Sequence, residues 1–339
     1  MTMFLDKNVP MISMEMRPYR KRLILGTMLA AMITGFAAQN AGAGPIDWDK
    51  AQELREGVKL VKIDEMSSVD IVGSDKKTIE EARGVPYDGK REMKSYVMRV
   101  DLTLNGLKTT ATGRDVDWGK PMPEDPKNRG KQIIRTKRQR TVDFMKEVAA
   151  REVEGRKAEV ICGFNTAPWS PWPPPQHLYA VPSGVCISDG VDIKPTKAED
   201  GAFFVIDRKG KCSITDKRPS DTNDVWIVHS GFAIIMKDGR DIDGGGYEKV
   251  LHPRMAAGLS RDGRYLYVVA VDGRKPGWSW GANIRDLQIL FRDAGAYDAI
   301  NFDGGGSASL CWWDPEQSAP VLINKTENRC VAVNLVFYR

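Results

Sequence analysis

The ten residues Asn301-Phe302-Asp303-Gly304-Gly305-Gly306-Ser307-Ala308-Ser309-Leu310 place an aspartate directly before three consecutive glycines. Because glycine lacks a Cβ atom, this stretch predicts a loop that reaches positive φ angles and lets a substrate approach the backbone closely. Successive N–H groups of such a loop can turn toward an anion. We therefore expect Asp303 to perform proton chemistry beside the backbone of Gly304, Gly305 and Gly306, with Ser307 as a hydrogen-bond donor.

The sequence before this loop predicts a strand, a helix and a second strand. Residues 265–271 are β-branched and aromatic, as in a buried strand, and residues 297–302 resemble them. Between them, apolar residues recur with helical spacing over 284–294. Asn283 can cap this helix at its start and Gly295 can close its end. We expect an α+β fold, a mixed β-sheet domain with packed helices, in which this unit ends in the DGGGS loop.

The two predicted strands bring two aspartates together. Asp272 follows the first strand, in the turn Asp272-Gly273-Arg274, and Asp303 follows the second. If the strands are parallel neighbours, a right-handed crossover places both carboxylates at the same edge of the sheet. Open α/β sheets usually bind their ligands at that edge.

The order of short motifs after residue 250 resembles the phosphodiester glycosidase family. The blocks that carry the resemblance are Pro253-Arg254-Met255-Ala256-Ala257-Gly258, Asp262-Gly263-Arg264, Val271-Asp272-Gly273-Arg274, Gly281-Ala282-Asn283 and Asn301 to Ser307. A looser likeness extends back to residue 92, where Cys162-Gly163-Phe164-Asn165 stands in place of the family's Asn-Gly-Gly-Phe-Phe-like strand end. The resemblance implies an enzyme that removes a sugar from a phosphodiester, with its domain over residues 91–339.

The chemistry of that reaction assigns roles to charged residues. The leaving phosphate is already a good leaving group, so the site must chiefly hold the phosphate and stabilise an oxocarbenium-like centre. Arg254 is the predicted phosphate clamp, because a guanidinium can contact two oxygens at once. Asp303 is the first-choice base or nucleophile and Asp272 the second carboxylate, with Arg274 setting its protonation state. The alternative for both aspartates is a turn-capping role, which is common for Asp before Gly.

Four further residues are predicted to contact the sugar or its proton. Asn165 ends a predicted strand, where its amide suits a sugar hydroxyl, and His229 sits at a strand end that suits a proton donor. Trp169, in a proline-rich loop, and Trp278, after Asp272, offer flat apolar faces to sugar C–H groups. The alternatives are a turn-forming asparagine, a buried histidine and tryptophans that only pack loops onto the sheet.

Residues 1–43 have the pattern of a cleaved signal peptide. Basic residues precede an apolar stretch over 23–38, and the small residues Ala41-Gly42-Ala43 follow. The apolar stretch is shorter than the roughly 20 residues of a membrane span, and an uncleaved anchor is the alternative. We expect export to the periplasm or the cell exterior without stable membrane insertion. The segment holds five basic and two acidic side chains, so its removal lowers the net charge from +5 to +2 and gives no reason to expect nucleic acid.

Three other expectations concern the remaining chain. Residues 44–90 are predicted to form an N-terminal lead or cap with one strand near 58–63. In an oxidising compartment Cys311 would pair with Cys330, and a Cys162–Cys186 bond is the other pairing considered, which leaves Cys212 free. A calcium ion on Asp272, Asp303 and backbone carbonyls is undecided, because the sequence lacks a dense acidic ligand loop.

Two other functions fit the same residues. One is a non-catalytic glycan-binding or polysaccharide-assembly protein that uses the same scaffold. The other is a glycosidase for linkages without phosphate. All three imply a carbohydrate partner, such as a surface exopolysaccharide.

Overall fold

The computed structural model describes residues 39–42, 44–67, 71–126, 131–243 and 249–339. The predicted signal peptide thus lies almost wholly outside the described residues. Helices are few and short in the described ranges: α1 (Gly73–Arg83), α2 (Thr141–Ala149) and α3 (Ile284–Ala294), with the 3₁₀ turn η2 (Gly305–Ser307). None of the helices described is both long and apolar enough to cross a bilayer.

The largest sheet has nine strands among the described residues. Its spatial order is β1 (Gln39–Ala41), β3 (Val58–Ser67), β4 (Lys90–Asp101), β20 (Tyr265–Val271), β19 (Arg254–Leu259), β21 (Asp298–Asn301), β17 (Ala233–Lys237) and β18 (Arg240–Asp241), and β2 (Gln52–Arg55) pairs with β3. Residues 44–90 therefore contribute strands to this sheet, since β3 pairs along the length of β4.

The remaining strands form four smaller sheets. One five-stranded sheet has the order β23 (Ala319–Leu322), β22 (Leu310–Asp314), β9 (Val160–Asn165), β24 (Asn334–Tyr338) and β5 (Lys108–Ala111). The other has the order β13 (Val191–Asp192), β12 (Cys186–Ser188), β16 (Val225–Ser230), β14 (Asp200–Asp207) and β15 (Cys212–Lys217). A three-stranded sheet has the order β10 (Trp169–Ser170), β11 (Tyr179–Pro182) and β6 (Thr136–Lys137). A two-stranded sheet consists of β7 (Glu152–Val153) and β8 (Arg156–Lys157).

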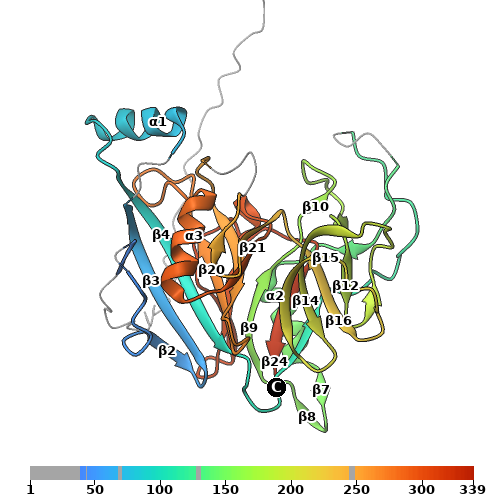
Figure 1. Ribbon diagram of the computed structural model, residues 1–339. Coiled ribbons are helices and arrows are strands. Elements are labelled where there is room, and N and C mark those ends of the chain that lie inside the picture. The colour runs from blue at the N-terminus through green and yellow to red at the C-terminus, as the bar shows by residue number, and fades with distance from the viewer. Residues whose placement is uncertain (1–38, 43, 68–70, 127–130, 244–248) are drawn as a thin grey trace, which may run out of the picture. The chain divides into compact units, whose positions relative to one another are not determined.

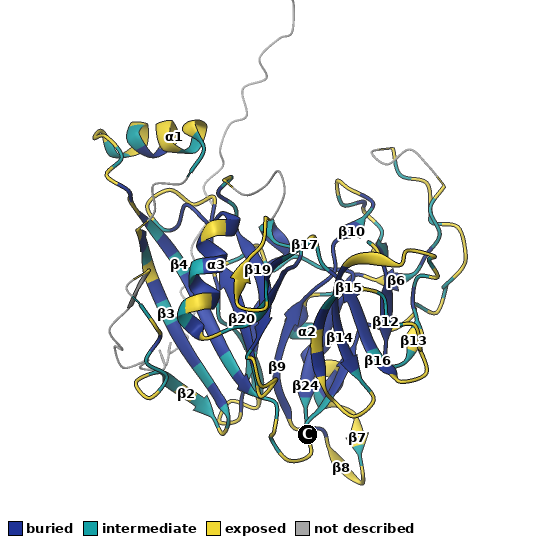
Figure 2. Cartoon of the chain, in the orientation of Figure 1, coloured by how far each residue is buried: buried dark blue, intermediate teal, exposed yellow. Residues whose placement is uncertain are grey.

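Both faces of the large sheet are buried, which explains the apolar run in β20. Leu266, Val268 and Ala270 join a core shared with the two five-stranded sheets. Tyr267 and Val269 point the other way, into a core shared with α3. Side chains of a strand alternate between faces, so only a strand covered on both sides needs apolar residues at every position. Figure 1 shows α3 in front of the large sheet, and Figure 2 shows its strands mostly in the colour of buried residues.

The predicted helix over 284–294 is confirmed as α3, and the structure is consistent with a mixed α+β fold dominated by β-sheet. The Asn283 side chain and Asp286 form a reciprocal capping box at its start, and Gly295 ends it with φ at 91°. These are local signals, so sequence alone suffices to find them.

The prediction that the strands over 265–271 and 297–302 are adjacent in the sheet is wrong. β19 lies between β20 and β21 and runs antiparallel to both, so the two flanking strands are parallel without sharing hydrogen bonds. Their carboxyl ends nevertheless lie at one edge of the sheet, where the antiparallel β19 begins with Arg254. The inserted strand thus brings Arg254 to the edge where Asp272 and Asp303 follow their strands.

The predicted Cys311–Cys330 disulfide is also wrong, because all five cysteines carry free thiols. Cys311 is buried in the core beneath α2. Cys330 lies in the segment before β24, close to Arg138. The alternative pair also remains unbonded, since Cys162 and Cys186 lie on strands of different sheets.

Candidate active site

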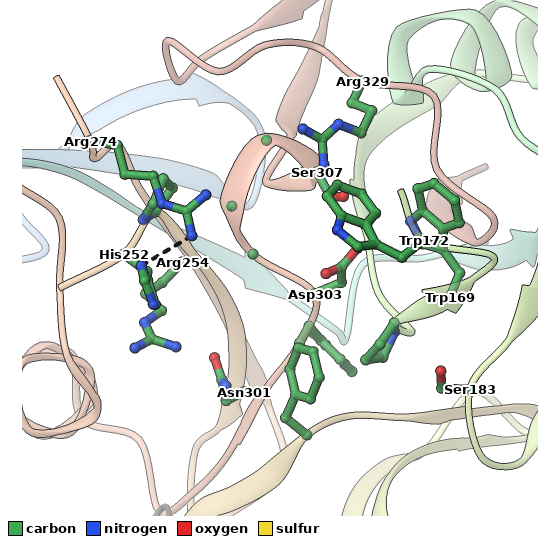
Figure 3. Close-up of a pocket in the computed structure, with 17 residues that line it drawn as sticks. Trp169, Trp172, Ser183, His252, Arg254, Arg274, Asn301, Asp303, Ser307 and Arg329 are labelled. Carbon is green, nitrogen blue, oxygen red and sulfur yellow. Dashed lines mark hydrogen bonds between the residues drawn. The ribbon is translucent and has the colours of Figure 1, made fainter. Parts of the chain in front are cut away.

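A cavity of about 550 Å³ opens at the edge of the large sheet where β21 ends. Its size lies within the range of small-molecule sites, roughly 300–1,000 Å³. Segments far apart in the sequence line it (Figure 3): Pro168, Trp169, Trp172, Ser183, Phe232, His252, Pro253, Arg254, Arg274, Asn301 to Ser307 and Arg329. The predicted glycine loop therefore forms one wall of the cavity.

Asp303 is the one carboxylate among the residues described as lining this cavity. Asn301, Phe302 and Asp303 all line the cavity, and the Phe302 ring is buried edge-to-face against Phe204. Burial raises the pKa of the Asp303 carboxyl from 3.8 to about 6, although hydrogen bonds from Ser307 and Trp169 and the charge of Arg329 oppose the rise. A carboxyl with this pKa changes charge near neutral pH, as a proton-transfer group must.

The glycine loop is held too closely for side chains. The Gly305 N–H donates to the Pro253 carbonyl at 2.9 Å, and Gly305 has φ at 60°. A Cβ on Gly304 would lie 2.5 Å from that same carbonyl oxygen, and one on Gly306 would lie 2.5 Å from the Glu327 carboxylate. Gly304 is therefore needed for packing against the backbone and Gly305 for its conformation, whereas the side chains that a Cβ on Gly306 would meet can move.

Two arginines and a histidine gather on one side of the loop. Arg254 is buried, with Nε donating to the Ala282 carbonyl and Nη2 to the Val250 carbonyl, both at 2.9 Å. Arg274 turns its Nη2 toward Nδ1 of His252 at 3.1 Å. Burial, together with these two guanidinium groups, lowers the pKa of His252 to about 4. His252 is then neutral at pH 7, and accepting at Nδ1 leaves its proton on Nε2 as a donor.

A third arginine lies on the other side with two tryptophans. The guanidinium of Arg329 lies over the Trp172 ring, 4.7 Å from its centroid, and Nη2 pairs with Glu327 at 2.6 Å. Trp172 is 58% exposed and rests edge-on against Trp169, which is 8% exposed. Trp172 and Phe232 are the only exposed aromatic side chains in the part of the chain that the structure describes, and both line this cavity.

Three predicted ligand-contacting residues do not line the cavity. Asn165 is buried, and its amide ties β9 to the glycine loop by donating to the Asp303 carbonyl at 2.7 Å and accepting from the Ser309 N–H at 2.9 Å. His229 is buried in β16, where Nδ1 shares a hydrogen bond of 2.9 Å with the Thr166 hydroxyl. Burial lowers the pKa of His229 to about 3, so it stays neutral at physiological pH. Trp278 donates from its indole to Asp272 at 3.0 Å.

Asp272 is placed apart from Asp303. It lines a smaller cavity of about 80 Å³ that shares Arg274, Gly305 and Gly306 with the larger one. Its Oδ2 accepts from Trp278 and from the Lys325 N–H at 3.1 Å, so it holds two loops together. The predicted pairing of Asp272 with Arg274 gives way to the contact between Arg274 and His252. Across the described residues, no group of three His, Cys, Asp or Glu side chains is arranged to hold a metal ion.

Among the cavity residues that the predicted site did not include are the polar side chains of His252, Asn301 and Arg329. Asn301 begins the motif that contains Asp303, and His252 directly precedes the motif that contains Arg254. Their position in the sequence could therefore have suggested them. Arg329 lies in a loop with no motif, and only the pairing of β22, β9 and β24 brings that loop to the site. No local sequence pattern predicts that Arg329 lies at the site.

The cavity combines one carboxylate, three guanidinium groups and the exposed indole of Trp172, and groups of these kinds suit a carbohydrate ligand. The phosphodiester glycosidase family model matches residues 158–338, more than half of the chain. The chain belongs to the phosphodiester glycosidase family, as its motifs predict.

One solved structure with a TM-score above 0.5 has a similar fold, and two others are less similar. The catalytic domain of zebrafish N-acetylglucosamine-1-phosphodiester alpha-N-acetylglucosaminidase, auto-inhibited by its pro-peptide, is 15% identical with a TM-score of 0.54, covering 85% of this chain and 87% of that one. A putative exported protein from Burkholderia pseudomallei K96243 is 12% identical with a TM-score of 0.49, covering 78% and 80%. A hypothetical protein from Synechocystis is 11% identical with a TM-score of 0.46, covering 84% and 62%. No curated protein sequence matches this chain.

Proposed function

We propose that this protein is an exported hydrolase that cleaves a sugar from a glycosyl phosphodiester. The observation that carries the proposal is the composition of the large cavity, which is lined by Asp303 together with Arg254, Arg274 and Arg329. A cavity with several cations and one carboxylate attracts an anionic ligand and keeps a group for proton transfer.

The phosphate is held on the side of Arg254, Arg274 and His252. Arg254 is fixed by two backbone carbonyls, so its position is set before the ligand arrives. Preorganised donors stabilise developing charge without reorganising during the reaction. Neutral His252 adds an N–H donor and no charge. As the bond to the sugar breaks, negative charge grows on the bridging oxygen, and these groups stabilise it.

Asp303 activates the attacking water. In its ionised form the carboxylate accepts a proton from water while the water oxygen forms a bond to the anomeric carbon. The bond between that carbon and the phosphate oxygen breaks, and its electron pair leaves with the phosphate monoester. Because the pKa of Asp303 is about 6, the base form prevails above that pH. The indole of Trp172, exposed at the same cavity, provides an apolar face for the sugar ring.

The experiment is release of free sugar from a panel of glycosyl phosphodiesters and matched aryl glycosides by residues 44–339. Asp303→Asn should reduce kcat by at least about 100-fold, a typical effect of losing a general base. Arg254→Gln tests the phosphate clamp, and Arg240→Gln, an exposed arginine on β18 away from the cavity, is the matched control.

The outcomes separate the candidate functions. Release from phosphodiesters alone, lost in Asp303→Asn, supports the proposal. Release from aryl glycosides alone identifies a glycosidase for linkages without phosphate. Glycan binding without any turnover identifies a binding or assembly protein. N-terminal sequencing of the protein recovered from the periplasm or medium tests cleavage after residue 43.

A further inference from the structure

The cations of the large cavity form two groups on opposite sides of Asp303. Figure 3 shows Arg254, Arg274 and His252 on one side of the glycine loop and Arg329 with Trp169 and Trp172 on the other. A Cβ on Gly305 would meet Arg274 at 3.5 Å, whereas one on Gly306 would meet Arg329 at 2.6 Å. Of the three arginines, Arg329 is the one whose charge lowers the pKa of Asp303. The two cationic groups are thus separate places in one cavity.

Arg329 keeps the capacity to bind an anion. Its ion pair with Glu327 uses Nη2, and the Glu327 side chain is 64% exposed, so this pair competes with water and contributes little. A guanidinium carries five N–H donors in a planar fork. The contact with the Trp172 ring holds the guanidinium at the cavity, and a planar fork suits bidentate recognition of phosphate.

Asn301 adds an amide to the cavity wall below His252 and Arg254 in Figure 3. It is buried at the cavity wall, and its Oδ1 has no hydrogen-bond partner. A buried amide oxygen without a donor is costly, so a ligand that brings one is favoured. A hydroxyl of the bound sugar that reaches this oxygen would supply the donor.

A single phosphodiester carries one negative charge and needs only one of the two cationic groups. We infer that the substrate carries a second phosphate on the sugar, remote from the anomeric carbon, as each internal unit of a polymer joined through sugar phosphates does. Arg254, Arg274 and His252 hold the scissile phosphate, and Arg329 on Trp172 holds the next one. This inference rests on the proposed function and names its substrate class.

The test compares two ligands that share one sugar. The first is its methyl phosphodiester at the anomeric carbon, and the second carries an additional phosphate on a hydroxyl across the ring. Their Kd values are measured by calorimetry with the full chain carrying Asp303→Asn, which prevents turnover. A second ionic contact should tighten binding about tenfold, or about 1.4 kcal/mol. The added Arg329→Gln substitution should reduce that ratio to about two, while Arg240→Gln should leave it unchanged.

The outcomes distinguish this inference from the proposed function. Equal Kd values for the two ligands, or a ratio that survives Arg329→Gln, would overturn the inference even if the singly charged ester is hydrolysed by the wild type. An Arg329-dependent ratio without turnover of either ligand would uphold the ligand class and overturn the hydrolase. Arg329→Lys keeps the charge without the planar fork, so an intermediate ratio supports the inference if the glutamine variant folds poorly.

Discussion

Replacing Asp303 with asparagine should stabilise the protein while it removes activity. Burial raises the pKa of this carboxyl from 3.8 to about 6, so the folded state binds its proton more tightly than the unfolded chain does. Below pH 3.8 both states are protonated and the charge costs nothing. Between pH 3.8 and 6 the unfolded chain ionises first, and wild-type stability falls as the pH rises. Above about pH 6 the folded protein bears the full cost of a buried charge.

The magnitude follows from the size of the rise. About two pKa units correspond to about 3 kcal/mol at about 1.4 kcal/mol per unit. Asp303 remains in partial contact with water in the cavity, so we expect about half of this, roughly 1.5 kcal/mol. For a domain of this size that free energy corresponds to an increase in Tm of about 2–3 °C.

Thermal unfolding followed by circular dichroism at pH 4, 5, 6, 7 and 8 measures the effect. The difference in Tm between Asp303→Asn and wild type should be near zero at pH 4 and reach its maximum above pH 6. Asp262→Asn is the control of opposite sign, because a hydrogen bond from Ser260 lowers the pKa of that exposed carboxyl. A variant less stable than wild type at pH 8 would refute the argument that Asp303 is a buried, costly charge.

Three further predictions test the site. Asn165→Ala removes two hydrogen bonds that hold the glycine loop, so the free energy of unfolding measured by chemical denaturation should fall by about 2–4 kcal/mol. A fall below about 0.5 kcal/mol would show that Asn165 does not hold the loop. Gly304→Ala forces a Cβ against the Pro253 carbonyl and should lower both Tm and kcat, and unchanged values would show that the loop has room. Trp172→Ala should raise KM for glycosyl phosphodiesters about tenfold, while Trp278→Phe should lower only stability; the reverse pattern in steady-state kinetics would exchange their roles.

Local sequence signals predicted the elements that build the site edge. Helix α3 follows from the apolar spacing of residues 284–294 and from the Asn283 and Gly295 caps, each of which acts within a few positions. The glycine loop after Asp303 follows from three residues without Cβ atoms, and the structure adds that two of those absent Cβ atoms would strike Pro253 and Glu327.

Residue roles were harder to predict, because a polar side chain can meet many partners. Asn165 has the chemistry to bind a sugar, but its amide is used inside the fold by the loop that follows Asp303. Asp272 leaves its strand at the expected edge, yet Trp278 and the Lys325 backbone occupy it. The sequence shows which groups are present and leaves open which of them the fold will use.

The sequence by itself determined the helix, the buried strands, the loop at Asp303 and membership of the phosphodiester glycosidase family, because short-range spacing and motif order encode them. The tertiary structure alone decided that β19 separates β20 from β21, that the cysteines stay unpaired, and that Arg329 reaches the cavity. Strand order and cavity lining depend on contacts between residues far apart in the chain. The physical reason is that burial in a shared core, which no single segment contains, selects among the pairings that local propensity permits.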